Sequence, residues 1–179
     1  YFDIDKWAKF FAIADVLKGY HATVPKSVKL YYNPSNGLFE PIAFDAHIGS
    51  GYYGQFIFLD YYEKDNINCG YVCEDEEWLK VFFNKKNDKF MKLYLDYLEK
   101  YTSKEYLNII NDIVKKKIEP FNELVYSEFS NSDRVFFKGF LPYYFDSGPI
   151  IKRAKLIRTK LKSFKNFTLL KKDINNVDF

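Results

Sequence analysis

The stretch SVKLYYNPSNGLFEPIAF, residues 27–44, decides the fold of the first part of this 179-residue chain. Two runs rich in apolar and aromatic residues, 27–33 and 38–44, flank the turn sequence Pro34-Ser35-Asn36-Gly37. Proline presets one backbone dihedral and Asn-Gly tolerates positive φ, so the stretch predicts a β-hairpin. Pro41 indicates that the second strand lies at an edge or carries a bulge.

Helical patterns surround this hairpin. Residues 3–18 predict an amphipathic helix with Asp3 as N-cap and Gly19 as its stop. After an irregular region, 49–74, with one short strand at QFIFL (55–59), helices are expected at 75–85, 88–101 and 148–162. The capping-box sequence 102–105 opens a further long helix, which Pro120 should kink or split.

These patterns predict an α+β fold, mainly helical, with a β-hairpin that carries the site. We expect one domain over 1–179, with the helix, hairpin and site in 1–54 and a helical part in 75–165. The chain starts without Met, and we interpret it as a piece of a longer polypeptide. Aromatic residues at helical spacing are assigned to the core, namely Phe10, Phe11, Phe82, Phe83, Tyr94 and Tyr97.

Composition excludes several classes of protein. A hydrophobic content of 47% argues against disorder, and a net charge of +3 does not favour nucleic acid as a partner. No apolar run approaches the ~18 residues of a membrane span. Cys69 and Cys73 are interpreted as two thiols in a loop, with a small disulfide or half of a zinc site as the alternatives.

A candidate site follows the hairpin. Asp45 comes at the end of the second predicted strand, and a loop with Gly49 and Gly51 comes after it. In an extended segment Asp45 and His47 would point to the same face, so both could address one ligand. His21, in the loop before the hairpin, can fold back toward them. A carboxylate in this position suits Mg²⁺, whereas an Asp that only forms a turn and structural histidines are the alternative.

The order of these segments resembles the CotH kinase family, which is named for a spore-coat protein. The similar stretches are YFDIDKWAKFFAIADVLKGY (1–20), VKLYYNPSNGLFEPIAFD (28–45), the late helix with Ile118-Glu119-Pro120, and GPIIKRAKLIRTKL (148–161). The resemblance implies the C-terminal lobe of an atypical protein kinase, which transfers phosphate from ATP with Mg²⁺ (or Mn²⁺) to a protein hydroxyl. An upstream N-terminal lobe would cover the nucleotide, and the family name suggests the spore coat or the cell surface.

The resemblance also implies roles for particular residues. Asp45 matches the metal-binding aspartate of the family. His21 stands where the family has the Asp that is the candidate base, and Ser27 stands at the position of an Asn. His47 replaces a second acid. These departures leave open a pseudokinase or binding module that has lost the catalytic acid.

Two further hypotheses remain. His21, Asp45 and His47 could together form a two-histidine, one-carboxylate metal site. The segment between Ser147 and Asp173 has nine Lys or Arg residues and no acid, which is typical of a solvated basic helix face and also suits an anionic partner. Tyr52 and Tyr53 could lie beside Asp45 if the glycine loop presents them.

Overall fold

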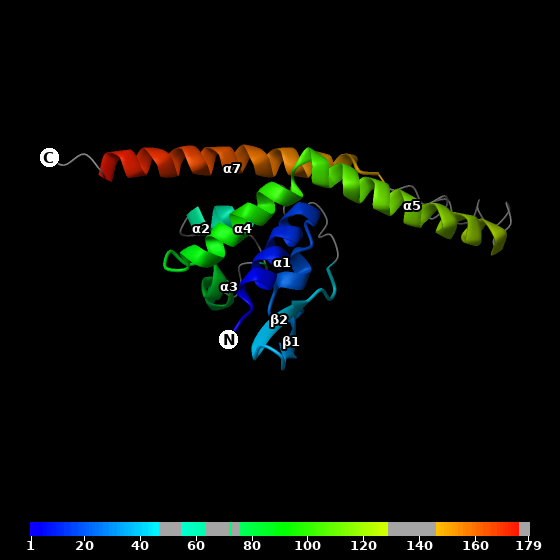
Figure 1. The fold of residues 1–179 in the computed structure, drawn as a ribbon, viewed down its shortest axis with the longest axis horizontal. Coiled ribbons are helices and arrows are strands. Elements are labelled where there is room, and N and C mark those ends of the chain that lie inside the picture. The colour runs from blue at the N-terminus through cyan, green and yellow to red at the C-terminus, as the bar shows by residue number, and fades with distance from the viewer. Residues whose placement is uncertain (47–54, 64–71, 73–75, 129–145, 176–179) are drawn as a thin grey trace.

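The computed structural model describes residues 1–46, 55–63, 72, 76–128 and 146–175. The predictions for His47, Tyr52, Tyr53, Cys69 and Cys73 fall outside these residues. In the described part a small two-stranded antiparallel sheet accompanies a mainly helical chain, so the coarse α+β prediction is confirmed. A compact body holds the sheet and the shorter helices, while the two longest helices leave one end of this body in opposite directions (Figure 1).

Helix α1 (Ile4–Leu17) is the central element of the body. The Asp3 side chain accepts a hydrogen bond from Lys6 N at 3.1 Å, as an N-cap does. The helix ends at Lys18, which has φ 57°, so Lys18 and not Gly19 adopts the left-handed conformation. Leu17, the last residue of the helix, is 46% exposed. A short 3₁₀ helix, η1 (Tyr20–Thr23), follows where we expected an irregular loop.

Strands β1 (Lys29–Asn33) and β2 (Leu38–Ile42) form the predicted hairpin, each two residues shorter at its outer end. Gly37, at φ 70°, donates its N–H to Asn33 O at 2.8 Å and closes the turn. The register runs without a bulge past Pro41, which faces Leu30. Phe39 ties the hairpin to α1, because its carbonyl accepts from Asp3 N and from Trp7 Nε1, each at 3.0 Å.

The segment predicted to contain a strand at 55–59 forms helix α2 (Phe58–Glu63) instead. Ile57, Phe58 and Leu59 are all fully buried, and a short run of this kind cannot be assigned to strand or helix by periodicity. The Asp60 side chain accepts from Ile57 N at 3.0 Å, and that side chain-to-backbone bond starts the helix.

The remaining helices are α3 (Glu76–Phe82), α4 (Asp88–Tyr101), α5 (Lys104–Glu128) and α7 (Gly148–Asn175). Ser103 caps α5 by accepting from Tyr106 N, whereas Thr102 donates to Leu98 O at the end of α4, so the capping residue was predicted one position early. Helix α5 continues through Pro120, so the predicted split is wrong, whereas a kink at Pro120 stays a prediction. Lys116, whose carbonyl loses its helical partner, is exposed, so water can satisfy that carbonyl. Helix α7 runs beyond the predicted end at 162.

The core lies between α1, α4 and the short helices. Trp7 stacks on Phe82 with ring centroids 4.9 Å apart, and Phe58 stacks on Phe83 at 5.1 Å. The aromatic residues assigned to the core are buried, except that Phe10 and Tyr97 are partly buried at its edge. Edge-to-face and stacked ring pairs of this kind add to the gain from burial alone. This aromatic packing fixes α1, and α1 in turn positions the turn that follows it.

Candidate functional site

His21 and Asp45 come together at the ends of α1 and the hairpin. His21 Nδ1 lies 2.9 Å from Asp45 Oδ2 and 3.1 Å from Ser27 Oγ. The side chains of His21 and Asp45 are 18% and 42% exposed, so the pair lies at the surface of the body and a ligand can reach it. The sequence therefore predicted correctly that His21 folds back on Asp45, and Ser27 belongs to the same cluster.

The backbone makes a sharp turn at Asp45. Strand β2 ends at Ile42, three residues earlier than Asp45, and Asp45 has φ 51° in the left-handed region. Asp is one of the few side chains that tolerate this conformation, at a cost of about 1 kcal/mol. The expectation that Asp45 continues an extended strand is therefore wrong, and with it the argument that Asp45 and His47 share a strand face. His47 itself lies outside the described residues.

The contacts of the His21 ring define what it can do chemically. When Nδ1 carries the proton and donates it to Asp45, the lone pair of the neutral ring is on Nε2. A carboxylate that holds Nδ1–H in this way orients an imidazole as a proton acceptor, as in many acid–base sites. Ser27 is buried, and its hydroxyl lies beside the same His21 nitrogen that faces Asp45.

The side chains of this cluster suit Mg²⁺ only when the ion arrives as part of a nucleotide complex. Among the described residues there is no group of three or more His, Cys, Asp or Glu side chains that could hold a metal ion. Mg²⁺ is commonly bound by one or two carboxylates, several waters and substrate phosphates, and Asp45 supplies one carboxylate. The two-histidine, one-carboxylate hypothesis needs His47 and stays a prediction.

A cavity of about 670 Å³ begins next to this cluster, at Ala46. Its walls come from the end of α1, from Gln55 and from the first turns of α7, and they carry the cations Lys18, Lys152 and Arg153. An alanine Cβ built at Gly19 would lie 3.6 Å from Ala46 O, which shows how closely the turn after α1 approaches the segment after Asp45. The cavity combines apolar walls with positive charge and so suits a ligand with anionic groups.

Beneath the cluster lies a buried polar network that the sequence did not indicate. Asp15 is fully buried in α1, and its carboxylate accepts from Tyr20 Oη at 2.7 Å, from Phe58 N at 3.2 Å and from Tyr94 Oη. Burial raises the pKa of Asp15 to about 6, against the lowering effect of Arg153 and of these hydrogen bonds. One signal was present, because Asp15 stands four residues after Phe11 on the apolar face of its helix.

Arg153 of α7 joins this network to the site. Its Nε–H donates to Asp15 O at 2.8 Å, and its Nη2 donates to Tyr20 Oη and to Phe56 O. Arg153 is 4% exposed. Because Tyr20 directly precedes His21, the buried guanidinium anchors the residue next to His21.

Comparisons with known proteins give no match. No protein-family model, no curated protein and no solved structure is similar to this chain. The resemblance to the CotH kinase family therefore stays a prediction that rests on the residues quoted above. Within the described residues, no helix has the length and apolar character that crossing a membrane requires.

Proposed function

We propose that this chain forms part of a CotH-like atypical protein kinase, in which the cluster of His21, Ser27 and Asp45 is the phosphotransfer site. The observation that carries the proposal is the 2.9 Å contact between His21 Nδ1 and Asp45 Oδ2, from two segments that the resemblance assigns to one site. In this proposal the chain corresponds to the C-terminal lobe, and an N-terminal lobe covers ATP.

Each residue then has a defined role. His21, oriented by Asp45, accepts the proton of the acceptor hydroxyl through Nε2. Asp45 accepts from His21 with Oδ2, and a carboxylate has enough lone pairs to hold Mg²⁺ or Mn²⁺ as well. The metal, when bound, would neutralise charge on the transferred phosphoryl group. Lys18 and Lys152, at the neighbouring cavity, supply positive charge for the nucleotide phosphates.

One observation favours a second candidate, a pseudokinase or nucleotide-binding module. Protonation of His21 would place an imidazolium 2.9 Å from the carboxylate that should hold the metal. A cation so close competes with Mg²⁺ for Asp45. Such a site would bind nucleotide but would lack a competent base.

The test is phosphate transfer from γ-labelled ATP, with Mg²⁺ or Mn²⁺, by the full-length protein that contains this chain. The variants are Asp45→Asn and His21→Gln, with Asp112→Asn as control, because Asp112 is an exposed carboxylate on α5 that belongs neither to the cluster nor to the cavity beside it. Asn keeps the tolerance of residue 45 for positive φ and removes only the charge. We expect a loss of transfer of at least 100-fold in both site variants and none in the control.

Three other results would change the assignment. Nucleotide binding without transfer in the wild type would select the pseudokinase. Transfer that survives Asp45→Asn would refute the site. A tightly held iron or zinc ion in the purified protein, lost in the His21→Gln variant, would select the two-histidine, one-carboxylate metal site.

A further inference from the structure

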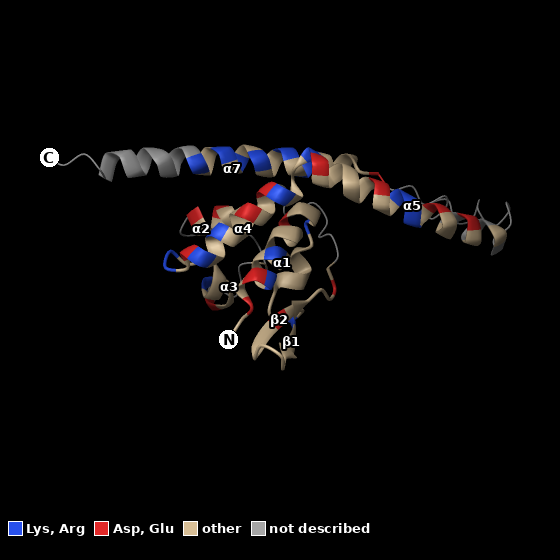
Figure 2. Ribbon diagram, in the orientation of Figure 1, with Lys and Arg blue, Asp and Glu red and all other residues tan. Residues whose placement is uncertain are grey.

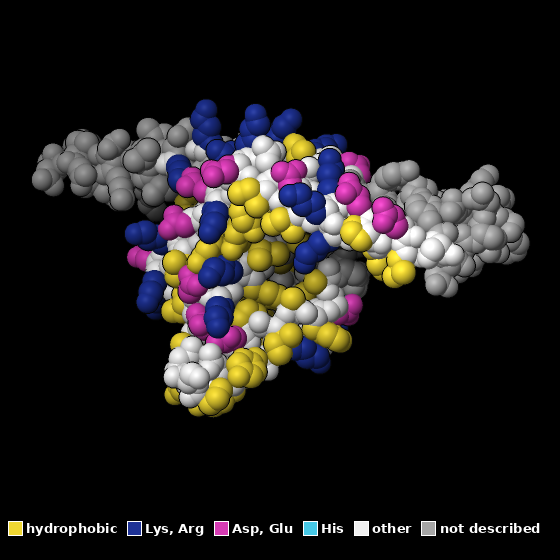
Figure 3. All heavy atoms as spheres, turned by 45° about the vertical axis from the view of Figure 1, so that its right-hand side comes forward, with side chains coloured by type: hydrophobic (Ala, Val, Ile, Leu, Met, Phe, Trp, Pro, Cys, Tyr) yellow, Lys and Arg dark blue, Asp and Glu magenta, His cyan; other side chains and the backbone are white. Residues whose placement is uncertain are grey.

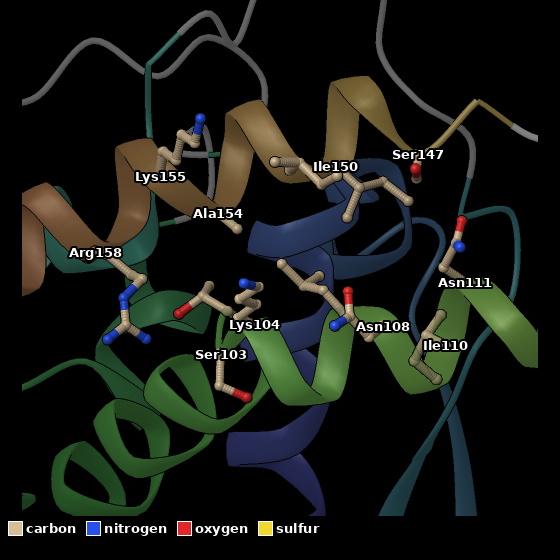
Figure 4. Close-up of a pocket in the computed structure, with 13 residues that line it drawn as sticks. Ser103, Lys104, Asn108, Ile110, Asn111, Ser147, Ile150, Ala154, Lys155 and Arg158 are labelled. Carbon is tan, nitrogen blue, oxygen red and sulfur yellow. The ribbon is translucent and has the colours of Figure 1, made fainter.

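A second cavity, of about 560 Å³, lies between the first turns of α5 and α7 (Figure 4). Aliphatic side chains from both helices form its walls, chiefly Leu107 and Ile110 from α5 and Ile150 and Ala154 from α7. Its volume falls in the range of small-molecule sites, which are typically apolar with a few polar groups. Ile150 lines both this cavity and the cavity that begins at Ala46.

Two cations stand at one end of this cavity. Arg158 points from α7 toward α5, and Lys104 projects from the first turn of α5 into the space between the helices, whereas Lys155 points away (Figure 4). No carboxylate among the described residues pairs with Lys104 or Arg158, although Lys160 and Lys165 of the same helix pair with Asp60 and Glu99. In Figure 2 basic residues recur along the described part of α7. An anionic group is the complement of this end of the cavity.

The opposite end contains an acceptor that lacks a donor. Asn111 lies there with Ser147, away from Arg158 (Figure 4). Asn111 Oδ1 is buried and has no hydrogen-bond partner within the part of the chain that the structure describes. Buried carbonyl oxygens nearly always have a partner, so this atom calls for a donor from a ligand. Figure 3 shows apolar side chains gathered in a hollow on this face of the body, with basic side chains above it.

We propose that this cavity binds an aliphatic carboxylate that carries a hydroxyl group at its far end. The carboxylate would bind Arg158 and Lys104, since guanidinium and carboxylate match in geometry. The aliphatic chain would lie along Leu107, Ile110, Ile150 and Ala154, and the hydroxyl would donate to Asn111 Oδ1. This proposal is independent of the proposed kinase activity, because it uses different residues.

The first test is calorimetric titration of the full chain with 12-hydroxydodecanoate, dodecanoate and 1,12-dodecanediol, below micelle-forming concentrations. We expect 12-hydroxydodecanoate to bind at least threefold more tightly than dodecanoate and at least tenfold more tightly than the diol. Equal affinity for the diol and the hydroxy acid would overturn the assignment of Arg158 and Lys104, because it would leave only non-specific apolar binding.

Variants distinguish binding of the ligand in this cavity from non-specific attraction to the positive charge of α7. Arg158→Gln and Lys104→Gln should each weaken 12-hydroxydodecanoate about tenfold. Lys162→Gln, an exposed cation of α7 that does not line the cavity, should change nothing. Asn111→Leu should abolish the preference for the hydroxylated acid while dodecanoate still binds. An equal loss in Lys162→Gln and Arg158→Gln would refute the site.

A second measurement locates the ligand without relying on variants. In methyl-labelled protein, 12-hydroxydodecanoate should shift the signals of Ile110, Ile150 and Ile151 and leave core Ile57 unchanged. Binding to phosphatidylglycerol vesicles without binding of the free hydroxy acid would overturn the proposal in favour of a membrane surface. Shifts confined to Ile57 and its neighbours would also overturn it, since the ligand would then lie in the core.

Discussion

Arg153 of α7 donates its Nε–H to the backbone oxygen of Asp15 of α1 across 2.8 Å, although 138 residues separate them in the chain. Both side chains are buried, and Tyr20 contacts both through its hydroxyl. The last long helix is therefore attached to the first by a charged group inside the protein. The stability of the whole body, and the placement of His21 beside it, should depend on this pair.

The pH dependence of the free energy of unfolding should report the titration of Asp15 directly. Its pKa of about 6 in the fold lies above the ordinary value of 3.8, so between those values the native state holds a proton that the unfolded chain releases. The contribution of Asp15 is therefore greatest below pH 4 and is lost as the pH rises through 6, by on the order of 3 kcal/mol. In urea titrations, Asp15→Asn should remove this slope.

A second carboxylate provides a control of opposite sign. Hydrogen bonds from Tyr97 and Lys9 lower the pKa of Asp5, so its contribution is present at neutral pH and is lost as the pH falls. Asp5→Asn should thus lower stability near pH 7 and leave the slope between pH 4 and 6 unchanged. If Asp15→Asn also left that slope unchanged, Asp15 would be ionised normally in the fold and the assignment would fail.

Removing Arg153 should be much more costly than removing an exposed arginine of the same helix. Arg153→Met leaves the Asp15 carboxylate buried without its cation, and we expect a loss of about 3–5 kcal/mol in the free energy of unfolding. Arg158→Met, at an exposed position, should change it by less than about 0.5 kcal/mol. The measurement is urea unfolding followed by the fluorescence of Trp7 and Trp78.

The double variant Asp15→Asn, Arg153→Met tests whether the two residues act as one unit. Because it removes both charges, we expect it to be more stable than Arg153→Met alone. Additive losses would mean that Arg153 stabilises the fold only through Tyr20 and Phe56, and that its charge is not needed by Asp15.

Much of the fold could be predicted because local signals were strong. The Asn36-Gly37 turn, the Asp3 cap and the bounds of α4 depend on neighbouring residues alone. The failures have tertiary causes. Residues 55–59 look like a strand, but Asp60 and the core convert 58–63 to helix. Likewise, the contact of His21 with Asp45 followed from chain connectivity, whereas the partners of Asp15 come from α4, α7 and residue 58, which no local pattern brings together.

Two glycines, one with positive φ and one without, should respond oppositely to alanine. Gly37 has φ 70°, with only Tyr32 Oη within 4 Å of an added Cβ, so Gly37→Ala should cost about 1 kcal/mol through backbone strain alone. Gly19 has φ −76°, and an added Cβ would make ordinary contacts with Ala46. Gly19→Ala should therefore stabilise by about 0.4–1 kcal/mol, by restricting the unfolded chain. Thermal unfolding of both variants checks the prediction, and a loss in Gly19→Ala would show that this turn does not tolerate a side chain.

The strained backbone at Asp45 allows stability to be separated from function. Asp45→Gly removes the contact with His21, which is partly exposed and contributes less than about 1 kcal/mol, but it also relieves the left-handed strain of about the same size. Asp45→Ala loses the contact and keeps the strain. We therefore expect Asp45→Gly to unfold within about 0.5 kcal/mol of the wild type and Asp45→Ala to be about 1 kcal/mol less stable than Asp45→Gly. Urea unfolding of the two variants measures this difference directly.

If the glycine variant is stable but does not bind Mg²⁺-ATP, the acid is retained at a strained position for binding, as functional residues often are. If both variants lose stability equally, φ at residue 45 relaxes in solution, and Asp45 contributes to the fold mainly through its contact with His21.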